Sequence, residues 1–163
     1  MAADDSSQAD AQPFQAVGFA LSTLGFAVAS RFHELLAPLG IEPRDFALLR
    51  AIAAGEGLSQ QALGEQLRIP PSRMVAFIDA LQDRRLLERR PHPSDRRAHA
   101  LYLTSAGRKL LGKAVAVASG FERELCAGLS AAEREKLLAL LGSVREQLGL
   151  PPGVHSAHLA ATG

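Results

Sequence analysis

The stretch from Leu58 to Thr104, LSQQALGEQLRIPPSRMVAFIDALQDRRLLERRPHPSDRRAHALYLT, decides the fold. It predicts a first short helix at about 60–67, with Ser59 as the candidate N-cap. The pair Pro70-Pro71 then interrupts the chain, and a second helix follows, because a proline in the first turn of a helix loses no intrahelical hydrogen bond. Four apolar residues of the second helix recur at the spacing of one buried stripe: Met74, Phe77, Ile78 and Leu81.

Two expected strands, 86–90 and 100–103, follow these helices. Pro91 and Pro93 exclude a regular strand in the connection between them. Residues 84–97 contain six arginines against two acids, so the connection is strongly basic. The order of helix, turn, helix and basic hairpin predicts a winged helix-turn-helix. Its second helix would enter a major groove, and its hairpin would reach a phosphate backbone or a minor groove.

Length and composition fit one domain of 163 residues. The net charge of +1 does not by itself indicate nucleic acid, so that inference rests on the clustered arginines. The single cysteine excludes an internal disulfide. The acidic N-terminus is unlike a signal peptide, and no apolar run reaches the roughly 20 residues that span a bilayer. We therefore expect a soluble cytoplasmic protein.

Other helix boundaries carry local signals of their own. A helix is expected over 43–54, opened by a proline, and a long helix over 105–125, capped by Thr104. Ser130 and Glu133 have the spacing of a capping box that opens a last helix. The fold is thus expected to be mainly α, with about six helices and one hairpin.

The first helix is apolar on more than one side and needs more than one partner, and the last two helices are apolar enough to need burial outside the DNA-reading unit. We therefore expect dimerisation helices at 13–37 and 105–149 around a DNA-binding lobe at 41–104, with a disordered lead (1–12) and a flexible tail (150–163). A two-fold dimer would hold two reading helices roughly 34–36 Å apart, one turn of DNA.

Residues 37–148 resemble the MarR family of bacterial transcriptional regulators. The most specific part is LLERRPHPSDRRAHALYLTSAGRKLL, at 86–111. It has an arginine after the second helix (Arg89 or Arg90), an Asp-Arg-Arg at the tip of the hairpin, and Leu-Thr-x-x-Gly at the start of the next helix. This combination in this order is a strong signal.

The resemblance implies a homodimeric repressor of a pseudo-palindromic operator. We expect no cofactor, and the histidine spacing does not indicate a metal site. It also implies release from DNA by a small, often aromatic or phenolic, ligand bound between the dimerisation helices and the DNA-binding lobe. Arg97 would enter the minor groove and Asp95 would hold it in place. The expected DNA-binding residues are Ser72, Arg73, Ala76, Arg90, Asp95, Arg96 and Arg97.

The chain departs from the family pattern at two turns. Glycine is common in the family where this chain has Arg68 and Arg85, so Arg85 would need a strained or different turn, since positive φ is uncommon outside glycine.

Arg89 and Arg90 alternate on a strand, so only one can face DNA. The other is expected to form an ion pair, with Asp79 as a candidate.

Several assignments have a plainer alternative. The candidate ligand-pocket residues have ordinary core or surface roles as their alternative: Phe32, His33, Phe46 and Arg50. Cys126 is expected to be an inert thiol, with a redox switch as the alternative. The arginines could instead meet an acidic protein partner, which would make the chain a winged-helix interaction module. No phosphate loop, nucleophile elbow or zinc-protease motif indicates an enzyme.

Overall fold

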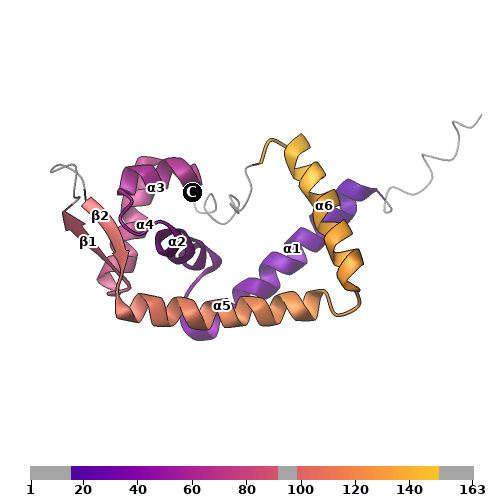
Figure 1. Cartoon of the computed structure of the whole chain (residues 1–163), viewed down its shortest axis with the longest axis horizontal. Helices are drawn as coiled ribbons and strands as arrows, with labels where there is room; N and C mark the ends of the chain where they lie inside the picture. The colour runs from indigo at the N-terminus through magenta and orange to yellow at the C-terminus, as the bar shows by residue number, and fades with distance from the viewer. Residues whose placement is uncertain (1–15, 92–98, 151–163) are drawn as a thin grey trace, which may run out of the picture.

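The computed structural model describes residues 16–91 and 99–150. Over these residues the chain forms six α-helices, one short 3-10 helix and one antiparallel hairpin (Figure 1). This confirms the predicted mainly α winged helix-turn-helix. The elements in chain order are α1 (Val17–Leu36), η2 (Ala37–Leu39), α2 (Pro43–Ala54), α3 (Gln60–Leu67), α4 (Pro71–Asp83), β1 (Leu87–Pro91), β2 (His99–Leu103), α5 (Ser105–Leu125) and α6 (Ala131–Gln147).

Side-chain caps fix the starts of three helices where the sequence predicts them. The Ser59 hydroxyl accepts a hydrogen bond from the Ala62 N–H at 3.1 Å, which begins α3. The Thr104 hydroxyl does the same for α5. Ser130 and Glu133 form the complete capping box of α6. Each cap satisfies a backbone N–H that has no partner within its helix.

The main core lies inside the lobe formed by α2, α3, α4 and the hairpin. The inner side of α4 contributes three side chains to this core, Met74, Ile78 and Leu81, and each is at most 1% exposed. Burial of each such side chain stabilises the fold by about 1.5–3 kcal/mol. Phe77, the fourth residue of the predicted stripe, is only half-buried, and the Arg44 guanidinium lies 4.5 Å from the centre of its ring.

The hairpin differs from the prediction at Pro91. This residue was expected to lie outside any strand, but it ends β1 and pairs with His99. The prediction was wrong because it ignored the edge position of β1, whose only strand partner in the described part of the chain is β2. A proline at the end of an edge strand removes no needed ladder hydrogen bond.

A third segment joins β2 on its other side, which the sequence did not indicate. The Gly57 N–H donates to the Leu101 carbonyl, and the Leu101 N–H donates to the Leu58 carbonyl, both at 3.0 Å. Ser59 forms an isolated bridge with Ala100. The α2–α3 connection is therefore fixed to the hairpin, so the helix-turn-helix and the wing form one unit.

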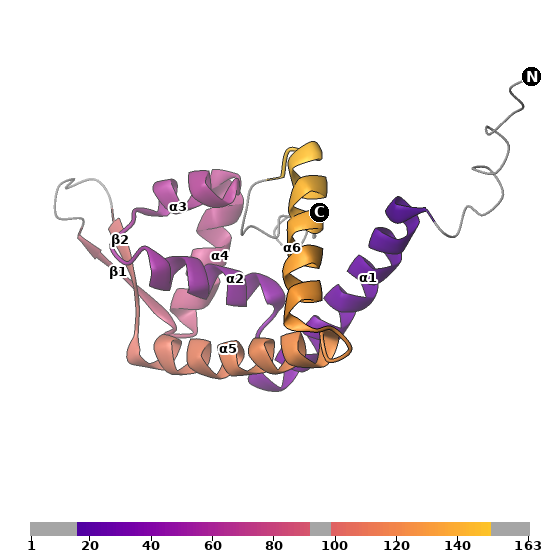
Figure 2. The same ribbon diagram turned by 45° about the vertical axis from the view of Figure 1, so that its right-hand side comes forward.

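Helix α5 connects this lobe to α1 and α6 at the other end of the molecule (Figures 1 and 2). A second apolar cluster joins α1, α2 and α5 through Leu36, Ile41, Phe46 and Ala114. Helix α6, in contrast, has no buried residue. Its leucines and the following Leu148 are exposed: Leu137 41%, Leu138 62%, Leu140 57%, Leu141 38% and Leu148 66%.

Candidate nucleic-acid interface

Helix α4 has the geometry of a reading helix. Its inner side is buried in the lobe, and Ser72 and Ala76 lie exposed on the outer side of its first half. Arg73, in the same half, is partly buried. Residues near the N-terminus of a recognition helix contact base edges in helix-turn-helix proteins. These three residues therefore occupy positions suitable for DNA contact, and their role stays a prediction.

Arg89 joins the wing to both helices of the helix-turn-helix. Its guanidinium donates to Gln60 of α3 at 3.0 Å and to Gln82 and Asp79 of α4 at 2.6 and 2.5 Å. The predicted ion pair with Asp79 is thus confirmed. A planar guanidinium with five N–H donors suits three acceptors at once. Arg89 is therefore a structural link that also offsets the Asp79 charge on α4.

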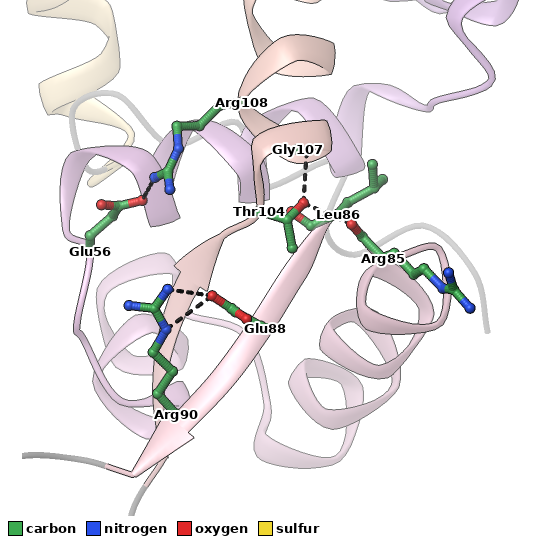
Figure 3. Close-up of polar contacts among 8 residues, drawn as sticks. All are labelled: Glu56, Arg85, Leu86, Glu88, Arg90, Thr104, Gly107 and Arg108. Carbon is green, nitrogen blue, oxygen red and sulfur yellow. Dashed lines mark hydrogen bonds and ion pairs between the residues drawn. The ribbon is translucent and has the colours of Figure 1, made fainter.

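Arg90 projects from the opposite face of β1, as strand alternation requires. Its Nε and Nη2 atoms donate to Glu88 Oε1 at 2.9 and 2.5 Å (Figure 3). Its guanidinium also lies 4.4 Å from the centre of the Tyr102 ring. Sequence reasoning missed these two partners, although a residue two positions away on a strand shares its face. Glu88 and Tyr102 hold Arg90 in place on the outer side of the wing.

The junction between the wing and α5 explains the Leu-Thr-x-x-Gly motif. The Thr104 hydroxyl donates to the Arg85 carbonyl at 2.7 Å and accepts from the Gly107 N–H at 3.0 Å (Figure 3). A Cβ atom at Gly107 would lie 1.9 Å from the Leu86 carbonyl oxygen, so only glycine allows α5 to approach this closely. The motif thus fixes the angle at which the wing leaves the lobe.

Two arginines occupy the turns where the resemblance predicted strain. Arg68 and Arg85 have φ values of 54° and 57°, in the left-handed region that favours glycine. A residue other than glycine costs roughly 1–2 kcal/mol there. The Arg85 conformation is supported by the Thr104 hydrogen bond to its carbonyl.

The positive charge of the arginine-rich segment is partly neutralised by distant acids. Arg84 donates to Asp45 at 3.1 Å and to the Gly40 carbonyl at 2.7 Å, which ties the end of α4 to the start of α2. Arg108, outside this segment at the start of α5, is also paired, with Glu56 (Figure 3). Acids outside the segment therefore also neutralise its arginines, and its free positive charge is smaller than the two acids within it indicate. Asp95, Arg96 and Arg97 lie outside the described residues.

The candidate pocket residues fall into two groups. The Phe32 ring packs edge-on against Phe46 at 5.6 Å, and the Arg50 guanidinium lies 5.6 Å from the centre of the Phe46 ring. His33 instead lines an open hollow of about 390 Å³ between α1 and the start of α2, together with Ser30 and Pro43. The structure therefore separates His33 from the other three residues.

Cys126 lies buried at the end of α5. Burial, reinforced by the neighbouring Glu122 carboxylate, raises the pKa of the thiol. A raised pKa keeps the sulfur protonated at neutral pH, whereas redox-sensing cysteines react as thiolates. These surroundings favour the inert thiol over the redox switch.

Residues 16–91 and 99–150 lack two kinds of feature. None of the helices there combines the length and apolarity needed to cross a membrane. Within the same ranges, no three histidine, cysteine or acidic side chains are grouped as a metal site would require.

The outward-facing α4, the hairpin beside it and the fixed α2–α3 connection define a winged helix-turn-helix regulator. A model of the MarR family matches residues 39–98. Over 109 residues the chain is 30% identical to the transcriptional regulator HosA of Escherichia coli, covering 67% of this chain and 78% of HosA. The chain belongs to the MarR family of DNA-binding transcriptional regulators, which are not enzymes.

Solved structures agree in fold and in extent. The transcriptional repressor CouR bound to a 23-mer DNA duplex is 34% identical, with a TM-score of 0.72, covering 79% of this chain and 92% of that one. CouR from Rhodococcus jostii RHA1 bound to p-coumaroyl-CoA is 27% identical, with a TM-score of 0.68, covering 80% and 92%.

Proposed function

We propose that the protein is a homodimeric, ligand-responsive repressor that binds a pseudo-palindromic operator in the cytoplasm. The observation that carries this proposal is the exposed first half of α4 beside a wing held to it by Arg89. The relative bound to a DNA duplex supports the same use of these elements. In this proposal Ser72, Arg73 and Ala76 enter the major groove.

The wing completes the interface. Arg90 and Arg96 contact phosphates, and Arg97, oriented by Asp95, enters the minor groove, where the electrostatic potential of a narrow groove attracts arginine.

The dimer rests on the exposed apolar side chains of α1 and α6. Phe26 of α1 is 77% exposed and Leu138 of α6 is 62% exposed, and both helices carry further exposed large apolar side chains. Contiguous apolar surface of this kind marks a protein interface. A second copy that covers these residues would place two copies of α4 about one DNA turn apart.

The proposed effector is a small molecule of the aromatic or phenolic class, and the ligand-bound relative supports this class. The hollow beside His33 lies between the proposed dimerisation helix α1 and the lobe helix α2. Phe32, Phe46 and Arg50 border the same α1–α2 junction from its packed side. A ligand there would change the angle between the lobe and the dimer.

Substitution at the wing tip tests the DNA-binding proposal. The variant Arg97→Ala should weaken binding to a duplex from the upstream region of its own gene about fivefold or more, because a groove arginine contributes roughly 1–3 kcal/mol. Lys113→Ala, which removes an exposed cation of α5, is the control. Fluorescence anisotropy gives the affinity and light scattering gives the mass. Unchanged affinity with an intact dimer would contradict the proposal and favour the alternative, a winged-helix module for an acidic protein.

A further inference from the structure

Val75 is an exposed apolar residue in an unusual place. It is 44% exposed, and every other large apolar side chain of comparable exposure in the described residues lies on α1, α5, α6 or the segment after α6. The apolar surface of α1 and α6 is assigned above to the dimer. Val75 alone belongs to the winged-helix lobe, on the reading helix and within its first half.

The surroundings of Val75 leave its methyl groups accessible to a flat surface. Ser72 and Ala76, its exposed neighbours on α4, have short side chains. Asp79, one turn further along, is engaged by the Arg89 guanidinium at 2.5 Å. This part of the helix therefore presents a small apolar patch, made of Val75 and Ala76, and the charge of Asp79 beside it is offset by Arg89.

We propose that Val75, supported by Ala76, reads the C5-methyl group of a thymine in the major groove. This inference rests on the proposed DNA-binding function and specifies what the helix recognises. The thymine methyl is the apolar group that a base pair of unmodified DNA presents in the major groove, and small apolar side chains recognise it by contact. Valine has no hydrogen-bonding group, so it cannot distinguish bases by donors or acceptors.

Deoxyuridine provides a direct test, because it differs from thymidine only by the missing C5-methyl group. A duplex is first selected from a random library with the purified full-length protein. Each thymine of one half-site is then replaced in turn by deoxyuridine, and the dissociation constant is measured by fluorescence anisotropy at fixed salt. At one position the replacement should weaken binding about fourfold, the effect of exposing one buried methyl group.

Two variants show whether Val75 causes this loss. With Val75→Ala the ratio between the deoxyuridine and thymidine duplexes should fall below about twofold, because Ala is too short to bury the methyl fully. Val115→Ala is the matched control, since Val115 is 43% exposed but lies on α5. It should keep the wild-type ratio whatever its effect on overall affinity.

The outcomes separate this inference from the function on which it rests. Equal binding to all thymidine and deoxyuridine duplexes, or a Val75→Ala variant that keeps the wild-type ratio, would overturn the role of Val75 and leave DNA binding intact. Failure to select any duplex in dilute buffer would overturn both proposals. Circular dichroism melting confirms that each variant is folded.

Discussion

Gly107 offers the sharpest test of how the wing is attached. In the variant Gly107→Ala the new Cβ would lie 1.9 Å from the Leu86 carbonyl oxygen, whereas an ordinary contact needs roughly 3.5 Å. Helix α5 and the backbone before β1 must therefore separate by more than an ångström. This movement breaks the hydrogen bonds that join them, from the Thr104 N–H to the Leu86 carbonyl at 3.1 Å and from the Thr104 hydroxyl to the Arg85 carbonyl at 2.7 Å.

The size of the effect follows from these contacts. Each buried group left without a partner costs about 1–3 kcal/mol, while alanine recovers up to about 1 kcal/mol of helix propensity. The free energy of unfolding should therefore fall by about 2–4 kcal/mol. Urea unfolding followed by far-ultraviolet circular dichroism measures this difference, at one fixed protein concentration because the proposed dimerisation would contribute to stability.

Gly112 provides the matched control on the same helix. A Cβ atom there would meet nothing within 4 Å, so Gly112→Ala should be as stable as the wild type or more stable by up to about 1 kcal/mol. If both variants had the same stability, the close approach of α5 to Leu86 would not be the reason for glycine in the motif.

Three further variants test separate contacts. Arg85→Gly should raise the free energy of unfolding by up to about 1 kcal/mol, because relief of the positive φ exceeds the entropy that glycine adds to the unfolded chain; a lower urea midpoint would contradict this. Hydrogen bonds from Ser130 lower the pKa of Glu133. The ionised Glu133 carboxylate therefore stabilises the fold at pH values above the ordinary glutamate pKa, and this stabilisation is lost as the pH falls through the lowered pKa. Glu133→Gln should flatten that acid dependence in thermal melts between neutral and acidic pH. Arg89→Met should weaken DNA binding at every salt concentration without changing the salt dependence, whereas loss of a phosphate contact would reduce that slope.

Local chemistry made the helix boundaries predictable from the sequence. Ser59, Thr104 and Ser130 each cap the helix that begins at the next residue, and a cap involves only residues within three positions. The pairing of Arg89 with Asp79 was also accessible, because strand alternation turned one of two adjacent arginines towards α4. Such inferences succeed when the periodicity of one helix or strand determines the direction in which a side chain points.

Contacts between distant segments could not be predicted in the same way. Arg84 pairs with Asp45, 39 residues away, and nothing in the local pattern of either residue indicates the other. The attachment of Gly57 and Leu58 to β2 depends on how the α2–α3 connection crosses the hairpin. The candidate ligand residues failed to form one group for the same reason, since adjacent residues Phe32 and His33 face different surroundings on α1.

The ion pairs reduce the free positive charge that the arginine-rich segment offers to DNA. Arg84, Arg89 and Arg90 each face an acid, and two of these acids, Asp45 and Asp79, belong to helices of the lobe. An arginine paired in this way adds little to the long-range attraction of DNA, because its field is cancelled close by. The Arg89 contacts also join the wing to α4, and a fixed arrangement of the two lowers the ordering cost of binding. A net charge of +1 is therefore compatible with a DNA-binding protein in which several arginines are paired with acids of the lobe.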